Sequence, residues 1–131
     1  MNSSIFTVEE KENYLYIKAL IEDLSISSKD SDETLKDVDN KLVKNIMFDF
    51  EKVVNCDATI LKFLQKANAV VIEKDGFIVI CNVSNAVKEQ IESIQSPQEI
   101  HASYTFSEAE DYLYMVELEK ELGDLDEDFT I

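Results

Sequence analysis

Two short apolar runs constrain the fold of this chain more than any other feature. Residues 77–81 read FIVIC, and Asn45–Phe50 reads NIMFDF, with Asp49 as the one charged residue of the two runs. Near-continuous apolar runs of this length are typical of strands buried on both faces, as in parallel sheets covered by helices. Segments with helical spacing of apolar residues separate the strand candidates from one another. Strands that alternate with helices predict right-handed crossovers and a largely parallel sheet.

The N-terminal part of the chain predicts a hairpin, a loop and a helix. Ser4–Val8 and Tyr14–Leu20 are the two strands of the hairpin, and residues alternate in the second strand as they do in a half-buried strand. Ser25–Glu33 is rich in Ser, Asp and Lys, so we expect a mobile loop there. Apolar residues at helical spacing then predict a short amphipathic helix that contains Leu35, Val38 and Leu42.

A longer helix is predicted to begin at Ala58, directly after Asp57. Aspartate is a good N-cap because its carboxylate accepts hydrogen bonds from the first free N–H groups of a helix. We expect Asp75–Gly76 to end this helix and turn the chain into the strand at 77–81. Apolar residues fall on one face of the helix, at Ile60, Leu61, Leu64, Ala67 and Val71.

The C-terminal part predicts two more helices and a short strand. A helix with Val87, Ile91 and Ile94 on one side is expected to stop at Ser96–Pro97, and Ile100–Tyr104 reads as a short strand. Thr105 with Glu108 three residues later is a capping-box pattern, and Gly123 is expected at the end of the helix that follows. The fold class is therefore α/β, a four-to-five-stranded mixed sheet with a mostly parallel core and about four helices. We expect one domain over residues 1–123 and an acidic tail over 124–131.

The last helix carries two apolar stripes. Ala109, Leu113 and Val116 form one, and Tyr114, Leu118 and Leu122 form the other. Two stripes predict burial on two sides, one against the sheet. The second side would pack against the chain's own N-terminal region, or against a dimer mate or partner. Three further residues could add to such a surface: Tyr112, Met115 and Phe129.

The charge of the chain excludes some partners. A formal net charge of −16 repels nucleic-acid backbones and anionic membranes, whereas it is compatible with a basic protein partner or simply with solubility. No secretory signal or membrane-length apolar run is present in the sequence, so we expect a cytoplasmic protein. Cys56 and Cys81 both lie beside apolar runs and are expected to be reduced, buried thiols.

Several motifs, in order along the chain, resemble the STAS domain family of bacterial anti-sigma-factor antagonists. Asn45–Phe50 is similar to the family's apolar strand with an Asp near its end. Residues 57–61 (DATIL) stand where the family has DSSGL at the start of a helix. Phe77–Cys81, followed by Asn82–Val83–Ser84, is similar to the next strand, and Thr105–Ala109 to the start of the closing helix. The resemblance implies a STAS-like fold over residues 5 to 117 and a regulatory protein that binds a kinase-like anti-sigma factor.

One departure from the family pattern concerns its switch. In phospho-regulated members, the first Ser of DSSGL is phosphorylated by the anti-sigma factor, and this chain has Ala58 there. Ile60 takes the place of the family's Gly, and Thr59 remains as a neighbouring hydroxyl and a candidate phosphoacceptor. The chain is then either an antagonist that no kinase switches off or a STAS scaffold with another partner. The resemblance implies a partner surface formed by Asp57, Ala58, Thr59, Ile60 and Leu61. Alternatively, Asp57 and Thr59 only cap the helix.

The sequence offers little for catalysis. His101 is the one histidine, and we expect it to be a satisfied or surface residue. Cys56 precedes a helix start, where thiol pKa values fall, but a buried inert thiol is the simpler interpretation. Neither metal-ligand spacing nor a glycine-rich phosphate loop occurs in the sequence. We therefore predict a non-enzymatic binding module without cofactor or metal; the alternative is a scaffold or assembly subunit of a signalling or transport complex, possibly homodimeric through the last helix.

Overall fold

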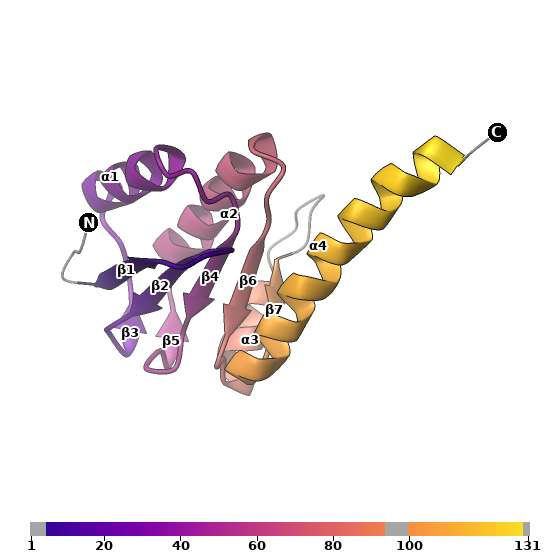
Figure 1. Ribbon diagram of the computed structural model, residues 1–131. Coiled ribbons are helices and arrows are strands. Elements are labelled where there is room, and N and C mark those ends of the chain that lie inside the picture. Colours follow the sequence, from indigo (N-terminus) through magenta and orange to yellow (C-terminus); the bar gives the residue numbers. More distant parts are fainter. Residues whose placement is uncertain (1–4, 94–99, 130–131) are drawn as a thin grey trace.

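The computed structural model describes residues 5–93 and 100–129, and its centre is a five-stranded mixed sheet (Figure 1). The strand order is β1-β2-β4-β6-β7, with β1 antiparallel to β2 and the remaining neighbours parallel. This confirms the predicted hairpin and the mostly parallel core. The strands are β1 (Phe6–Glu10), β2 (Leu15–Ala19), β4 (Ile46–Asp49), β6 (Ile78–Cys81) and β7 (His101–Ala102).

The two apolar runs lie side by side in the middle of the sheet. β4 pairs with β6 in parallel register, Met47 opposite Val79, and every residue of both strands is buried. In β2, Leu15, Ile17 and Ala19 are buried and the residues between them are half-buried, as the alternation predicted. Apolar side chains at both faces of β4 and β6 require cover on both sides of the sheet.

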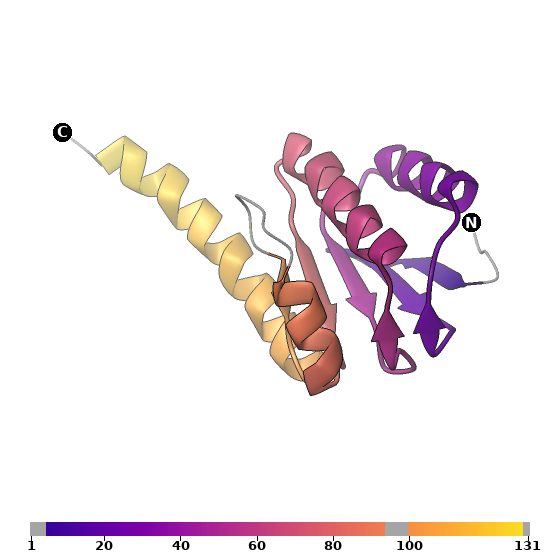
Figure 2. The same cartoon turned by 180° about the vertical axis from the view of Figure 1, so that it is seen from behind.

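Four helices provide this cover. α1 (Ser28–Asp39), α2 (Ala58–Glu73) and α3 (Asn85–Glu92) lie over one face, and α4 (Phe106–Phe129) crosses the other (Figures 1 and 2). The larger core lies under the first three helices and includes Phe48, Phe63 and Val87. A smaller core lies under α4, where Ala109 and Leu113 pack with Met47, Val79 and Cys81.

The segment between β2 and α1 differs from the sequence expectation. Ser25–Glu33 is not one loop, because α1 begins at Ser28, where the Ser27 side chain accepts a hydrogen bond from the backbone N–H of Asp30. This N-cap and the acidic first turn stabilise the helix earlier than the apolar spacing indicated. Leu42 lies beyond the helix and is 99 % exposed, so its predicted place on the apolar face is wrong.

A second, two-stranded sheet was not predicted. β3 (Asp23–Leu24) pairs in parallel with β5 (Asn55–Cys56), and β5 leads directly into α2. Elements this short carry almost no periodicity in the sequence. Their pairing brings the chain before α1 next to the N-terminus of α2.

The boundaries of α3 and α4 differ in part from those that the sequence predicted. α3 ends at Glu92, and the predicted stop at Ser96–Pro97 lies outside the described residues, as does Ile94. α4 begins at Phe106, and the backbone N–H of Glu108 donates to Thr105 Oγ1 at 3.1 Å, as the capping pattern predicted. The expected end at Gly123 is wrong, because α4 continues to Phe129. An interior Gly costs only about 1 kcal/mol of helix propensity, and no proline follows it.

Candidate functional site

The N-terminus of α2 is built around the carboxylate of Asp57. Asp57 is the N-cap, and its Oδ1 accepts hydrogen bonds from the backbone N–H groups of Thr59 at 2.9 Å and Ile60 at 3.2 Å. These bonds satisfy two of the N–H groups that a helix start leaves free. The predicted cap is therefore confirmed.

The hydroxyl of Thr59 ties this helix start to the segment before α1. Thr59 Oγ1 donates a hydrogen bond to Asp57 Oδ1 and accepts one from the backbone N–H of Ile26 at 3.0 Å. The Ser25 hydroxyl lies 3.2 Å from the same oxygen. Hydrogen bonding by the hydroxyls of Ser25 and Thr59, with the N–H groups of the helix start, lowers the pKa of Asp57 and keeps the carboxylate ionised at neutral pH.

The five predicted site residues divide between surface and core. Ala58 and Thr59 are exposed and Asp57 is half-buried, so these three form the tip of α2. Ile60 is wholly buried in the larger core, and Leu61 is half-buried against it. Ile60 is therefore wrong as a surface residue, because the first turn of α2 already points its apolar side chain under the sheet.

The sequence did not indicate several residues around the tip. Gln90 of α3 accepts from the backbone N–H of Cys56 at 3.0 Å and donates to Asn55 Oδ1 at 2.9 Å. Val54 lies exposed in the connection that leads into β5. Val54 precedes the helix in the same segment, whereas Ser25 and Gln90 come from separate segments and reach this region through the parallel pairing of β3 with β5 and the packing of α3.

A buried carboxylate lies on the other side of the sheet. Asp49, at the end of β4, accepts hydrogen bonds from Tyr16 Oη, from Asn82 Nδ2 at 3.1 Å and from the backbone N–H of Glu51 at 2.9 Å. Three donors offset the cost of burying a charged group. The Asp that interrupts the apolar strand is thus held in place by β2 and by the loop after β6.

The two candidates for catalysis lie in different sheets, Cys56 in β5 and His101 in β7. Burial, with a smaller effect of Asp57, raises the pKa of the Cys56 thiol to about 11, which disfavours the nucleophilic thiolate. His101 stacks on Tyr112 of α4 with 3.7 Å between ring centroids, and burial lowers its pKa. No cluster of three or more His, Cys, Asp or Glu side chains suited to a metal ion occurs in residues 5–93 and 100–129. Over the same described residues, none of the helices has both the length and the apolar character of a membrane span.

Fold and site together define the class. The chain is an α/β domain with a mixed sheet, helices on both faces and a capped, exposed helix tip beyond a short parallel strand pair. A family model for the STAS domain matches residues 3–109, so the chain belongs to the STAS domain family. No curated protein matches the chain significantly.

Solved structures with the same fold include two anti-sigma factor antagonists and a variant of RsbS. The anti-sigma factor antagonist SpoIIAA in its unphosphorylated form is 15 % identical, with a TM-score of 0.62 over 83 % of this chain and 97 % of SpoIIAA. An anti-sigma-factor antagonist (STAS) domain protein from Planctomyces limnophilus is 15 % identical, with a TM-score of 0.65 over 79 % of this chain and 92 % of that protein. A variant of RsbS from Moorella thermoacetica is 10 % identical, with a TM-score of 0.64 over 86 % and 97 % of the two chains. At sequence identities of 10–15 %, these structural similarities establish the fold alone.

Proposed function

We propose that this protein is a non-catalytic regulatory module that binds a kinase-like anti-sigma partner through the tip of α2 and does not switch by phosphorylation at Ala58. Membership of the STAS family and the fold shared with anti-sigma factor antagonists support a regulatory role. The observation that carries the proposal is the exposed methyl group of Ala58 at the family's switch position.

The environment of Ala58 fits a permanently available docking surface. A phosphate there would add about −1.5 to −2 charges beside Asp57 and change the shape of the tip. Ala58 has no hydroxyl, so the tip keeps its shape and charge.

The position of Thr59 supports the same proposal. Its hydroxyl oxygen already accepts the Ile26 N–H and donates to Asp57. Transfer of a phosphoryl group to this oxygen would break both bonds and place like charges beside the Asp57 carboxylate. We therefore assign Thr59 a structural role, holding the segment before α1 against α2.

The test places a charge at the proposed surface without disturbing the fold. Ala58→Glu adds a carboxylate in the first turn of α2, where the free N–H groups and the helix dipole accommodate it. Ala69→Glu makes the same substitution at an exposed position further along the same helix and is the matched control. Immobilised wild type and both variants are exposed to an extract of the source cells, and the retained proteins are identified by mass spectrometry.

We expect wild type and Ala69→Glu to retain an ATPase with a histidine-kinase-like fold and Ala58→Glu to lose it. The purified partner with ATP should then leave the wild type unmodified and phosphorylate Ala58→Ser. Retention of the ATPase by all three proteins would place the partner surface elsewhere. Phosphorylation of Thr59 in the wild type would refute the absence of switching.

A scaffold or assembly subunit is the second candidate function. It is favoured by the large apolar side chains that α4 leaves exposed beyond the sheet. A scaffold would retain its partners regardless of Ala58→Glu, so the same experiment separates the two functions.

A further inference from the structure

The C-terminal half of α4 lies outside the part of the chain that defines the family. The STAS family model ends at residue 109, whereas α4 continues to Phe129. SpoIIAA and the RsbS variant are each covered over 97 % of their own length but account for only 83 % and 86 % of this chain. Figure 1 shows α4 running past the edge of the sheet. Its outward half is therefore an addition to the shared domain.

Two opposite sides of α4 differ in burial but not in apolar character. Ala109 and Leu113 are fully buried against the sheet. Leu118 is nine positions after Ala109, which is two and a half turns at 3.6 residues per turn, so the two residues lie on opposite sides of the helix. The exposed side carries a stripe of four large apolar residues, Tyr114 (45 % exposed), Met115 (48 %), Leu118 (54 %) and Leu122 (48 %).

The structure corrects one expectation about this stripe. Tyr114 lies close enough to Tyr14 to affect its pKa, but Leu118 and Leu122 are about half exposed, and β1 forms the far edge of the sheet (Figure 1), so the N-terminal region does not cover the stripe. The remaining alternatives are a dimer mate and another partner.

The spacing of the stripe matches a helix-pairing seam. Met115, Leu118 and Leu122 follow one another at intervals of three and four residues, as the a and d positions of a coiled coil do. The sequence continues the same spacing with Leu125 and Phe129. Asp111, one heptad before Leu118, ends the seam on its N-terminal side.

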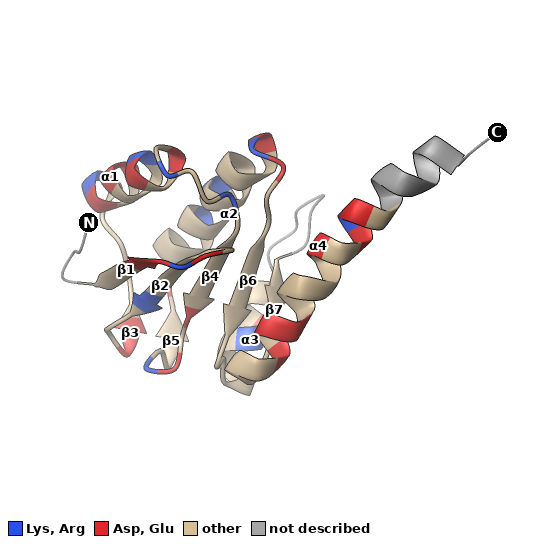
Figure 3. Cartoon of the chain, viewed as in Figure 1, with Lys and Arg blue, Asp and Glu red and all other residues tan. Residues whose placement is uncertain are grey.

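The flanks of this seam are acidic. With Met115 at an a position, Glu119 and Glu121 occupy the e and g positions, and the next heptad has Asp126 and Asp128 there. Lys120 does not offset these charges at the seam, because its Nζ donates to the carbonyl oxygen of Asp75 at 2.7 Å and lies 3.6 Å from Asp75 Oδ1. Figure 3 shows acidic residues on α4 on both sides of a stretch without charge.

The acidic flanks favour a different protein over a second copy of this chain as the partner of the stripe. In a pair of identical α4 helices, e and g residues of the two copies meet in either orientation, and every such contact would join two carboxylates. The net charge of −16 adds to this repulsion. A helix with an apolar seam and Lys or Arg on its flanks would instead gain both apolar burial and ion pairs.

We propose that the exposed stripe of α4 docks a basic amphipathic helix of a different protein, in a coiled-coil-like pairing. This surface is separate from the tip of α2 and does not depend on the function proposed for that tip.

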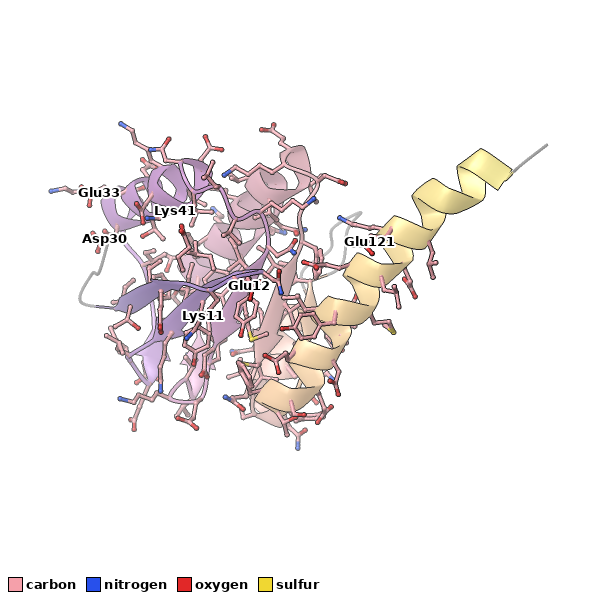
Figure 4. All side chains as sticks on the ribbon, viewed as in Figure 1. Lys11, Glu12, Asp30, Glu33, Lys41 and Glu121 are labelled. Carbon is pink, nitrogen blue, oxygen red and sulfur yellow. The ribbon has the colours of Figure 1, made fainter. Side chains whose placement is uncertain are left out.

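The probe for this proposal is a fluorescein-labelled synthetic helical peptide with Leu at its a and d positions and Lys at its e and g positions. A second peptide has Glu in place of each Lys. Binding of each peptide to the full chain is followed by fluorescence anisotropy. Leu118→Ser/Leu122→Ser removes the seam, and Glu119→Lys/Glu121→Lys reverses its flanks. Asp32→Lys/Glu33→Lys makes the same charge change on exposed positions of α1 and is the matched control (Figure 4 labels Glu33 on α1 and Glu121 on α4).

We expect wild type and the α1 control to bind the Lys peptide alike, and each α4 variant to weaken this binding about tenfold or more. The flank-reversed variant should gain affinity for the Glu peptide. Binding of the Lys peptide to wild type should also weaken in about 1 M salt, where the Debye length falls to about 3 Å.

Three results would overturn the proposal. The first is no binding of the Lys peptide to wild type. The second is equal binding by wild type and Leu118→Ser/Leu122→Ser, which would indicate attraction by net charge alone. The third is a dimer in analytical ultracentrifugation that the double Ser variant abolishes, because a second copy would then occupy the stripe.

Discussion

The hydroxyl of Tyr16 donates a hydrogen bond to the buried carboxylate of Asp49, joining β2 to the end of β4. Burial and this bond to Asp49 raise the pKa of Tyr16, so the phenol remains protonated and able to donate. The same carboxylate also accepts from Asn82 of the loop after β6, where the backbone has a φ of 59°. One charged residue at the end of an apolar strand therefore connects that strand with the neighbouring strand β2 and with the turn that follows β6.

Tyr16→Phe removes one of the three donors to Asp49 and leaves the ring in place. We expect the free energy of unfolding to fall by about 1–2 kcal/mol, because a buried charged acceptor loses a partner. Chemical denaturation measures the change. Tyr104→Phe, at an exposed position, should leave stability nearly unchanged, and an equal loss in both variants would contradict the role given to Asp49.

Asp57→Ala removes the N-cap of α2 and should cost about 1 kcal/mol at neutral pH. The pKa of Asp57 is lowered in the folded state, so its contribution is present above the unfolded value of about 3.9 and is lost as the pH falls through the folded value. The difference between wild type and variant should therefore shrink in acid. Denaturation at several pH values tests this, with Asp23→Ala at an exposed position of β3 as the control. A difference that does not depend on pH would show that the ionised carboxylate is not the stabilising species.

Gly76→Ala should destabilise the protein by about 3 kcal/mol. An added Cβ would lie 2.0 Å from the carbonyl oxygen of Lys44, so the backbone between α2 and β6 would have to move. The positive φ of this turn belongs to Asp75, at 64°, and close approach rather than backbone conformation requires the glycine. Thermal unfolding provides the measurement, and a stability equal to wild type would contradict the close approach.

Gly123→Ala, at the other glycine of the chain, should have the opposite effect. Because α4 continues past Gly123, alanine should favour the helix by about 1 kcal/mol locally and slow amide hydrogen exchange in the last turns of α4. If the helix instead ended at a left-handed Gly123, alanine would be unfavourable there and exchange would become faster.

Both thiols should react slowly in the folded protein. Burial is the main reason that the pKa is raised to about 11 for Cys56 and to about 12 for Cys81, against about 8.5 for a free thiol. A disulfide exchange reagent at about pH 8 should label neither residue quickly in native buffer and both in denaturant. A fast phase in native buffer, assigned by mass spectrometry, would identify a thiol that the fold does not protect.

Local patterns predicted the elements whose signal lies within one segment. The apolar runs at β4 and β6, the alternation in β2, the cap at Asp57 and the capping box at Thr105 each depend on residues a few positions apart. Local patterns gave a wrong boundary at two places. Ser27 caps α1 and starts the helix before the apolar spacing begins, and α4 continues beyond Gly123 although glycine commonly ends a helix.

The candidate site was predicted only in part, for a related reason. The sequence indicated that Asp57, Ala58 and Thr59 begin a helix, but Ile26, Ser25 and Gln90 reach that helix start only through the pairing of β3 with β5 and the packing of α3.

The sequence by itself determined the α/β class, the order of the main strands and helices, and the caps at Asp57 and Thr105, because these follow from periodicity and from hydrogen bonds between near neighbours. Only the tertiary structure decided which apolar residues are covered. Ile60 and Leu118 are both apolar residues on helices, yet one is fully buried and the other is 54 % exposed. Burial depends on which element packs against a side chain in the folded protein. The sheet covers only one side of α4, and α4 also extends past the edge of the sheet (Figure 1).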